Sequence, residues 1–433
     1  MAERLAFFDT VAEAQALVRD ARSLIPQGMA RSYGDAALSE CLMLSTRRFN
    51  RMISFDENSG RLRCQSGVTI ADIMATFVPR GWFVKVSPGT KFVSIGGAIA
   101  ADVHGKNHHK VGSFSTGVAS FDLLLASGEV VTCSREENPD LFRATLGGMG
   151  LTGLVTEVTL VLDRIPSAYA YQKVVKCPDL DSAMDTFEEN VNWTHSVAWI
   201  DCLARGEALG RSVVFLGEMA TPEQVRRFRP RVKDPFQFKM PTPVTVPFAF
   251  PNFALNSLTM RAFNAAFYNL PRPSDDVVDL NTYNYPLDRV LHWNRLYGKR
   301  GFFQYQCVLP LARSREGYRA ILEETSSFGV ASFLAVLKLF GEQEGLMSFP
   351  MAGYTLTMDF PVNAGTLGLA ERLDRIVEAH EGRLYLAKDA RMKASAFARM
   401  QHQTVDQFTD IKASVDPAQK FASLQSERLG LTS

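Results

Sequence analysis

The sequence has little of what would mark a disulfide-rich, zinc-stabilised or membrane-spanning protein. Its 433 residues include six cysteines, and no two of them form a C-x-x-C pair. A disulfide framework or a structural zinc site is therefore not expected, and a reducing compartment fits this cysteine usage. No uninterrupted apolar run reaches about 18 residues, so a transmembrane helix is not expected. Acidic residues interrupt the first 24 residues, which therefore lack the pattern of a secretory signal.

An excess of charge of one sign is also missing. The chain has 47 basic and 46 acidic residues, so its formal net charge is +1. This balance does not produce the long-range positive field that is typical of nucleic-acid-binding proteins. Hydrophobic residues make up 46% and charged residues 21%, which indicates a globular protein and not a disordered one. A chain of this length exceeds one ordinary hydrophobic core, so two domains are expected.

The first third of the chain combines short strand-like runs with isolated helices. Apolar residues recur with helical spacing over residues 11–24 and 69–81. Strand-like runs occupy 121–134, where a tight hairpin turn is predicted in the middle, and 153–165. Strands that alternate with isolated helices in this way predict an α+β fold rather than a doubly wound parallel sheet.

The pattern changes beyond Pro166. Strands and helices alternate over 301–361, a helix is predicted over 364–381, and residues 393–433 are helical and polar. Residues 235–269 are unusual because Phe and Pro are frequent there and charges are few. Two interpretations stay open for this segment: a connector packed on the core, or an exposed apolar flap that meets a lipid or an acyl chain.

Three glycine-rich segments lie in the first third, at 27–38, 87–114 and 145–153. Glycine lets backbone N–H groups approach a ligand closely, and a run of such groups suits a pyrophosphate. None of the segments matches G-x-x-x-x-G-K-[ST], which disfavours a P-loop nucleotidase. The glycines of 148–153 have G-x-G-x-x-G spacing, but they precede a strand, and this disfavours a Rossmann site. Simple turns between strands remain an alternative.

The second glycine-rich segment also carries a histidine cluster, with His104, His108 and His109 close to Lys106. Histidine is the commonest metal ligand, but no Asp, Glu or Cys pattern completes a tetrahedral site here. Flanking glycines would also fix the ligands poorly, so no metal site is predicted. Two interpretations stay open: solvated loop histidines, or histidine and lysine side chains that line a cofactor or substrate pocket.

Nine motifs, taken together and in this order, carry a specific resemblance. They are RSYGD (31–35), PGT (88–90), GGAIAADVHGKNHH (96–109), GSF (112–114), LGGMGLTG (146–153), FFQYQ (302–306), FLAVLKLFG (333–341), MDFP (358–361) and RLYLAKDAR (383–391). With them the chain resembles the decaprenylphosphoryl-β-D-ribose 2-oxidase family, which are flavoenzymes of the vanillyl-alcohol-oxidase type. The resemblance runs from Arg31 to the carboxyl terminus, and HGKNHH and KLFG are its most specific parts.

The resemblance implies an α+β fold with a two-part FAD-binding domain of the vanillyl-alcohol-oxidase, or PCMH, type. A substrate domain made of an antiparallel sheet with helices is inserted between the two parts. On this chain, residues 1–165 would form the FAD-binding domain and residues 166–383 the substrate-binding domain. Residues 384–433 would return to the FAD domain.

The resemblance also implies which residues contact FAD. These are Arg31, Ser32, Tyr33, Gly34, Pro88, Gly89, Thr90, Gly96, Gly97, Ala98, His104, Gly105, Asn107, Ala387 and Lys388. The bound FAD is expected to be non-covalent. The reason is that the first glycine-rich loop carries Ser32 and Tyr33 and lacks the histidine through which flavin-linked relatives attach it.

The implied substrate pocket shares Tyr33, His104 and Lys388 with the cofactor site. It adds Lys106, Gln304, Gln306, Lys338, Phe340 and Thr357. Glutamines can hold sugar hydroxyls through paired donors and acceptors, and lysines can meet a phosphodiester. Trp199 is expected to support the pocket wall. From the residues alone, solvent-facing positions for the two glutamines and for Lys338 and Lys388 stay open.

The implied reaction is oxidation of the 2-hydroxyl of a polyprenylphosphoryl-β-D-ribose to the 2-keto sugar. A hydride leaves C2 for the flavin, and a separate NAD(P)H-dependent short-chain reductase completes epimerisation to an arabinose donor for cell-envelope glycan. Lys388 is the candidate for stabilising negative charge on the reduced flavin. The candidates for the base are Tyr33, His104 and Lys338. With Lys388 they make up the predicted catalytic residues.

The sequence departs from the family at four places, one of which is YNYPLD (283–288), where the family has YHPLD, so sugar contacts there are expected to differ. Ala30 stands where the family usually has a second glycine, so close phosphate approach there is less favoured. Thr357 replaces the pocket cysteine that covalent nitroaromatic inhibitors attack in mycobacterial members, which predicts resistance to that chemistry. Thr355 replaces an asparagine, so contacts with the sugar are expected to differ.

Two other functions stay open alongside the lipid-linked one. The first is an FAD-dependent oxidase of a soluble sugar alcohol or aldonolactone. The second is a non-catalytic partner that binds flavin or a lipid-linked phosphosugar. A cytoplasmic location is expected, with peripheral contact to the inner membrane through residues 235–269 and no nucleic-acid partner.

Overall fold

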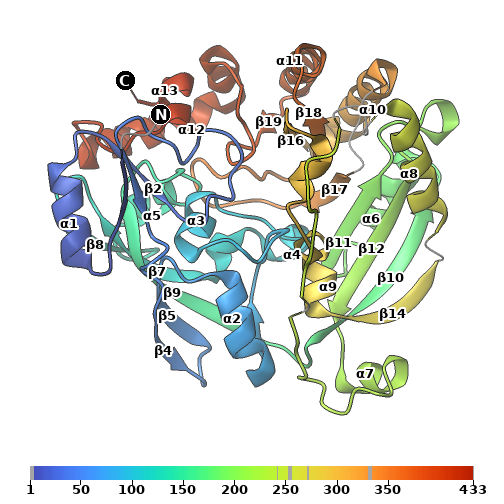
Figure 1. The fold of residues 1–433 in the computed structure, drawn as a ribbon, viewed down its shortest axis with the longest axis horizontal. Coiled ribbons are helices and arrows are strands. Elements are labelled where there is room, and N and C mark those ends of the chain that lie inside the picture. The colour runs from blue at the N-terminus through green and yellow to red at the C-terminus, as the bar shows by residue number, and fades with distance from the viewer. Residues whose placement is uncertain (1–3, 241, 252–255, 271–272, 330–333, 433) are drawn as a thin grey trace.

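The computed structural model describes residues 4–432 apart from 241, 252–255, 271–272, 330–333 and the side chains of 402 and 403. Helices and largely antiparallel sheets are mixed along the chain, so the predicted α+β class with an FAD-binding domain is confirmed. In Figure 1 the blue amino-terminal elements and the red carboxyl-terminal helices lie side by side, and a large sheet occupies the other end of the molecule.

A small parallel sheet opens the chain, in the order β1 (Arg4–Phe7), β3 (Leu42–Ser45) and β2 (Leu24–Gln27). Helix α1 (Val11–Asp20) packs Ala14 and Val18 into the core of this sheet. The helix predicted over 11–24 is wrong in its last turn, because Ala21 is extended and Leu24 already belongs to β2. Pairing with β3 in the sheet overrides the local helical spacing there.

A second sheet has the order β4-β5-β9-β7-β8, and one further strand, β6, pairs with β9. Its strands are β4 (Met52–Asp56), β5 (Arg61–Gln65), β6 (Trp82–Val84), β7 (Val118–Leu124), β8 (Val130–Ser134) and β9 (Leu154–Arg164). The predicted hairpin turn is confirmed, because Gly128 has a φ of +88° between the antiparallel β7 and β8. Such a left-handed turn residue suits glycine.

The helices of this part are short. They are α2 (Ile70–Phe77), α3 (Ile95–Ala100), α4 (His108–Val111) and α5 (Pro139–Thr145). Helix α2 starts with a reciprocal capping pair between Thr69 and Asp72 and continues as a 3-10 turn to Arg80. The helix predicted over 69–81 therefore forms, with its last turn tightened where Pro79 lies.

The largest sheet has eight strands in the order β14-β10-β12-β11-β17-β18-β16-β19. They are β10 (Tyr169–Cys177), β11 (His195–Ile200), β12 (Ser212–Met219), β14 (Ser274–Asp279), β16 (Phe302–Pro310), β17 (Ala335–Phe340), β18 (Gly353–Pro361) and β19 (Arg383–Leu384). All of its pairings are antiparallel.

Helices cover one face of this large sheet. They are α6 (Leu180–Glu189), α10 (Leu311–Phe328) and α11 (Ala364–Ala379), and all three contact strands of the sheet. The residues beneath them, such as Cys307, Leu337 and Leu356, are fully buried in one hydrophobic cluster. Because side chains alternate along a strand, the intervening residues of the same strands point to the opposite face.

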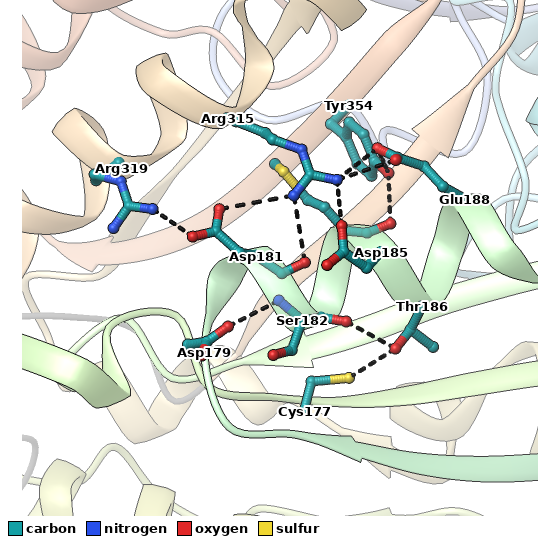
Figure 2. A network of polar contacts seen from close by, with 11 residues as sticks. Cys177, Asp179, Asp181, Ser182, Asp185, Thr186, Glu188, Arg315, Arg319 and Tyr354 are labelled. Carbon is teal, nitrogen blue, oxygen red and sulfur yellow. Dashed lines mark hydrogen bonds and ion pairs between the residues drawn. The ribbon is translucent and has the colours of Figure 1, made fainter.

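Ion pairs connect α6 and α10 at the surface (Figure 2). The Arg315 guanidinium lies 2.6 Å from a carboxylate oxygen of Asp185 and 3.0 Å from one of Glu188. Arg319 pairs with Asp181 at 2.6 Å. The Tyr354 hydroxyl, which reaches from β18 beneath, donates to the Met184 carbonyl. The charged groups are about half exposed, so each pair contributes little, and buried packing holds the helices.

The segment between α7 (Pro222–Phe228) and β14 carries β13 (Val244–Thr245) and α8 (Ser257–Asn269). Strand β13 pairs with β15 (Val290–Leu291), which follows the short α9 (Leu280–Asn284). Helix α8 packs on the large sheet mainly through Met260 and Asn264. The described part of this segment combines exposed apolar side chains, such as Val244 and Phe248, with Phe236 and Phe238, which pack on the core, so both interpretations of it stay open.

The carboxyl-terminal helices α12 (Ala394–Val415) and α13 (Leu424–Leu429) return to the amino-terminal part. The buried Lys412 ammonium donates to the carbonyls of Leu151 and Phe421 at 3.1 and 3.0 Å. It also pairs with the buried Asp416 carboxylate at 2.9 Å. The predicted division at residues 165 and 383 stays a prediction. In the part of the chain that the structure describes, no helix is long and apolar enough to cross a membrane.

The buried Lys412–Asp416 pair gives a stability prediction. Replacing Lys412 by Met removes one partner and leaves a buried carboxylate, which costs roughly 3–5 kcal/mol of unfolding free energy. The matched control is Lys393→Met, because Lys393 pairs with Glu371 at the surface, where the side chains are 74% and 55% exposed. That change should cost at most about 1 kcal/mol. Chemical denaturation measures both, and equal losses would contradict the role given to Lys412.

Candidate active site

A cavity of about 610 Å³ lies between the glycine-rich segments and the face of the large sheet opposite α6, α10 and α11. All three glycine-rich segments contribute to its lining, for example through Arg31, Gly97 and Met149. The sheet contributes side chains from β16, β17 and β18, and the carboxyl-terminal segment contributes Ala387 and Lys388. This volume is in the range of small-molecule and cofactor sites.

The backbone of the glycine-rich segments reaches the cavity closely. A Cβ added at Gly89 would meet no atom within 4 Å, so it would project into open space. A Cβ at Gly28 would lie 2.1 Å from Ser94 Oγ, and one at Gly105 would lie 2.6 Å from Asn107 Oδ1. Glycine therefore keeps the chain segments together and leaves room at the cavity wall, as a cofactor cradle requires.

Most of the residues predicted to contact FAD line this cavity. They are Arg31, Ser32, Tyr33, Pro88, Gly89, Thr90, Gly97, His104, Gly105, Ala387 and Lys388. Four others lie behind the lining. Gly34, with φ +79°, packs on Asp389 and Ala390, and Gly96 packs on Ser66. Ala98 is fully buried, and Asn107 Nδ2 donates to the Lys85 carbonyl at 2.8 Å.

The residues predicted for the substrate pocket lie on the same cavity, with one exception. Those that line it are Lys106, Gln304, Gln306, Lys338 and Thr357, and Trp199 lines it as well. Phe340 does not line it. Its ring is buried and packs against the rings of His104 and His108 at 4.7 and 4.5 Å. Gln304 and Gln306 are buried, so the solvent-facing interpretation of these two is wrong.

Three partly buried lysines that line the cavity dominate its electrostatics. Burial lowers the pKa of Lys338 and of Lys388 to about 8, and for Lys388 the Asp359 carboxylate opposes this shift. Burial, followed by repulsion from Lys338, lowers the pKa of Lys106 to about 7. Lys338 and Lys388 are only partly exposed and line the cavity, so they are not lysines of the open surface. A bound anion would restore the charge of these ammonium groups, so the site favours negatively charged ligands.

Lys388 and Tyr33 connect the two ends of the chain at the cavity. The Lys388 ammonium lies 4.1 Å from the centre of the Tyr33 ring, and the Tyr33 N–H donates to the Ala387 carbonyl at 2.9 Å. Burial, followed by the Asp359 charge, raises the pKa of Tyr33 well above its usual value. The Tyr33 hydroxyl is therefore a protonated group that donates hydrogen bonds at neutral pH.

Asp359 is a buried acid beside the cavity that the sequence analysis did not select. Its Oδ1 accepts a hydrogen bond from Gln304 Nε2 at 2.6 Å, and its Oδ2 has no partner. Burial raises the pKa of Asp359 to about 7, although the Gln304 hydrogen bond opposes this. The MDFP motif contained the signal, because Asp359 lies two residues from Thr357 on β18 and so points to the same face.

A hydrogen-bond network fixes the orientation of Gln306. The Thr355 hydroxyl donates to the Cys307 carbonyl at 2.8 Å, so it can only accept from Gln306 Nε2 at 3.3 Å. Gln306 Nε2 also lies 3.0 Å from His104 Nε2, which must then be the acceptor. This pattern assigns the His104 proton to Nδ1. Burial, with a smaller contribution from the Lys338 charge, lowers the pKa of His104 well below its usual value and keeps it neutral.

The other two histidines of the cluster have structural partners. His108 Nδ1 accepts from the Gly341 N–H at 3.1 Å, and its Nε2 lies 3.0 Å from Ser113 Oγ. His109 Nε2 lies 2.9 Å from the Trp193 carbonyl. His108 thus joins the glycine-rich segment to Gly341, directly after β17, the strand that carries Lys338. Within the described residues, no group of three or more His, Cys, Asp or Glu is arranged to hold a metal ion.

Several lining residues were not selected one by one, although some lie in segments that the sequence analysis singled out, such as 87–114, 235–269 and YNYPLD (283–288). They include Ser87, Phe215, Phe267, Tyr283, Asn284, Asp288 and Trp293. Asp288 belongs to the segment YNYPLD, and its carboxylate accepts from the Lys91 N–H at 2.9 Å. Phe215 and Phe267 come from β12 and α8, and only the tertiary arrangement brings them to the cavity.

Comparison with known proteins agrees with this geometry. A family model described as an FAD binding domain matches residues 2–134. A decaprenylphosphoryl-β-D-ribose oxidase of Mycolicibacterium smegmatis is 37% identical over 417 residues, which cover 95% of this chain and 90% of that protein.

Two other relatives extend the comparison. An uncharacterised protein of Streptomyces coelicolor is 32% identical over 377 residues, covering 84% of this chain and 100% of its own. A putative D-arabinono-1,4-lactone oxidase of Neurospora crassa is 32% identical over 155 residues, which cover only 35% of this chain and 28% of that protein. Because the Mycolicibacterium relative matches along nearly the whole chain, this chain is an FAD-dependent oxidoreductase that belongs to the decaprenylphosphoryl-β-D-ribose oxidase family.

Proposed function

We propose that this protein oxidises the 2-hydroxyl of a polyprenylphosphoryl-β-D-ribose to the 2-keto sugar. The observation that supports this most directly is the placement of three partly buried lysines and two buried glutamines on one cavity. Lysines whose positive charge few nearby carboxylates offset favour a phosphodiester. Glutamines in a fixed orientation favour sugar hydroxyls. When bound, FAD supplies the acceptor for the hydride that leaves C2 of the sugar.

The residues that line the glycine-rich side of the cavity would hold FAD. Gly89, Gly97 and Gly105 let the backbone approach it, and Arg31 would offset negative charge. The four residues behind the cavity lining would support the conformation of these loops: Gly34, Gly96, Ala98 and Asn107. Lys388 is placed to stabilise negative charge that develops on the cofactor, because its ammonium is already oriented on the cavity wall.

The two glutamines would orient the sugar. Gln304 gives an amide hydrogen to Asp359, and Gln306 gives its amide hydrogens to His104 and Thr355. Their amide oxygens are therefore oriented as acceptors for sugar hydroxyls. Lys106 and Lys338 would hold the phosphodiester, and the Thr357 side chain would border the sugar.

The three candidate bases differ in their suitability. Tyr33 is unsuited because burial raises the pKa of its hydroxyl. His104 is neutral, and its Nε2 is an acceptor that lies 3.0 Å from Gln306 Nε2. The pKa of Lys338 is lowered to about 8, so Lys338 can lose its proton more readily than a solvated lysine unless the phosphodiester holds it in the charged form. We therefore place the transfer of the 2-hydroxyl proton on His104 or Lys338.

The product of this reaction needs a second enzyme to complete the epimerisation. A keto sugar is reduced at C2 from the opposite face by an NAD(P)H-dependent short-chain reductase, which makes such an enzyme the expected partner in arabinose-donor biosynthesis.

We place the protein in the cytoplasm at the inner membrane. Residues 235–270 contain no Asp or Glu, and four of their apolar side chains are widely exposed: Val244 (71%), Phe248 (63%), Leu258 (75%) and Leu270 (78%).

The proposed function is tested by adding polyprenylphosphoryl ribose to the FAD-loaded protein without oxygen. We expect the visible flavin absorbance to bleach, and we expect no bleaching with Lys388→Met, because that variant loses the charge that stabilises the reduced cofactor. Retained FAD absorbance confirms that the variant still binds its cofactor. A wild-type spectrum that stays oxidised with this substrate but bleaches with a soluble sugar alcohol or aldonolactone would replace the proposed substrate.

The cofactor should be released by denaturation. No cysteine lines the cavity among the described residues, and the one lining histidine, His104, is committed to Gln306. Acid precipitation of the FAD-loaded protein should therefore leave a colourless pellet and a yellow supernatant. Yellow colour that stays with the washed polypeptide would show a covalent bond.

The apolar surface of residues 235–270 should bind anionic membranes. We expect the wild-type protein to sediment with phosphatidylglycerol vesicles, and Phe248→Ser with Leu258→Ser to weaken this at least about tenfold, because each removes an apolar side chain that would be buried in lipid. Leu311→Ser is the matched control, since Leu311 is 55% exposed elsewhere on the surface. Equal binding of both variants would exclude this segment as the contact.

A further inference from the structure

The cavity-facing side of the large sheet changes from polar to apolar across adjacent strands. On β16, β18 and β17 it presents Gln304, Gln306, Thr357 and Lys338. On β11 and β12 the same face presents apolar side chains: Val197, Trp199, Val213 and Phe215. The register places Trp199 beside Val336 of β17 and Val197 beside Phe215, so the two halves form one continuous surface.

Helix α8 packs against the apolar half of this face and borders the cavity there. The Phe267 ring packs against the Trp199 ring with centroids 4.7 Å apart, and Phe267 also lines the cavity. Val197, Phe215 and Phe267 are only partly buried although they lie on an interior wall, because they border the cavity. We call the surface of Val197, Trp199, Phe215 and Phe267 the apolar wall.

The apolar wall directly adjoins the polar half of the sheet. Lys338 on β17 and Phe215 on β12 are two strand spacings apart in the sheet order, which corresponds to about 10 Å. A ligand whose phosphate lies by Lys338 would therefore place the first part of an attached chain along Val197 and Phe215. Gln172 of β10 is a polar residue at the far margin of this half.

The outer surface beyond the wall is apolar as well. Helix α8 carries Phe267 toward the cavity, and it exposes Leu258 and Phe263 to solvent, with Leu270 exposed directly after its last residue. An apolar chain that leaves the cavity beside α8 would thus remain on apolar surface. A second sugar or a nucleotide would find few polar partners on the wall and would leave its own polar groups without hydrogen bonds.

We propose that the apolar wall is the binding site for the isoprenoid chain of the substrate, covering the isoprene units nearest the phosphate. This inference rests on the proposed function for the identity of the head group. The wall itself indicates the class of ligand: an apolar chain attached to a phosphate that the lysines of the cavity hold. Chain length then contributes to affinity by burial of apolar area.

The test measures binding of geranyl phosphate and farnesyl phosphate to the FAD-loaded protein by calorimetry. In the wild type, farnesyl phosphate should bind about tenfold or more tightly than geranyl phosphate, since the longer chain buries more methylene and methyl groups. In Phe215→Asn this preference should fall to less than about threefold, since the wall becomes polar. Leu311→Asn, a change at an exposed leucine elsewhere, should keep the wild-type preference.

A second variant guards against loss of folding. Val197→Trp keeps the wall apolar but fills it, so farnesyl phosphate should bind at least about tenfold more weakly while ribose 5-phosphate binds as in the wild type. Unchanged farnesyl phosphate affinity in both Phe215→Asn and Val197→Trp would overturn the inference. Failure of flavin bleaching with the lipid-linked ribose would instead overturn the proposed function, and wall-dependent binding of farnesyl phosphate would then still support a prenyl phosphate site.

Discussion

Alternation of side chains along the strands of the eight-stranded sheet is the constraint on which the rest of the structure depends. One set of residues, including Cys307, Leu337 and Leu356, is sealed under α6, α10 and α11 in the hydrophobic core. The intervening residues are then forced to the other face, where they line the cavity. The packing of one face and the chemistry of the other are therefore set by the same register, and a slip of one residue would exchange them.

The cavity holds more buried positive charge than its carboxylates offset. Lys106, Lys338 and Lys388 are partly withdrawn from water, and burial shifts Asp359 toward its neutral form. Such a site is costly to keep without a ligand, and an anionic group would relieve the cost by favouring the charged ammonium forms. Because burial disfavours the charged forms of these lysines, the cavity prefers a negatively charged ligand, whose binding stabilises the ammonium groups.

Closure of the chain on itself completes the site. The carboxyl-terminal segment brings Lys388 onto the Tyr33 ring, and the same segment continues into α12, whose Lys412 is anchored against the amino-terminal part by buried hydrogen bonds. The Arg428 guanidinium adds a second link, because it pairs with Asp35 just after the first glycine-rich loop and with Asp389 next to Lys388. Two distant parts of the sequence are held in one geometry by these contacts.

The sequence by itself determined the α+β class, the hairpin at Gly128 and the residue types of the site, because glycine, lysine and glutamine carry their chemistry in short motifs. It also determined the departures at Thr355 and Thr357. Only the tertiary structure decided that α1 ends at Asp20, that Phe340 supports His104 from outside the cavity, and that Asp359 orients Gln304. The apolar wall could not be predicted either. Its residues come from strands and a helix far apart in the chain, and their common face exists only once the sheet register and the packing of α8 are fixed.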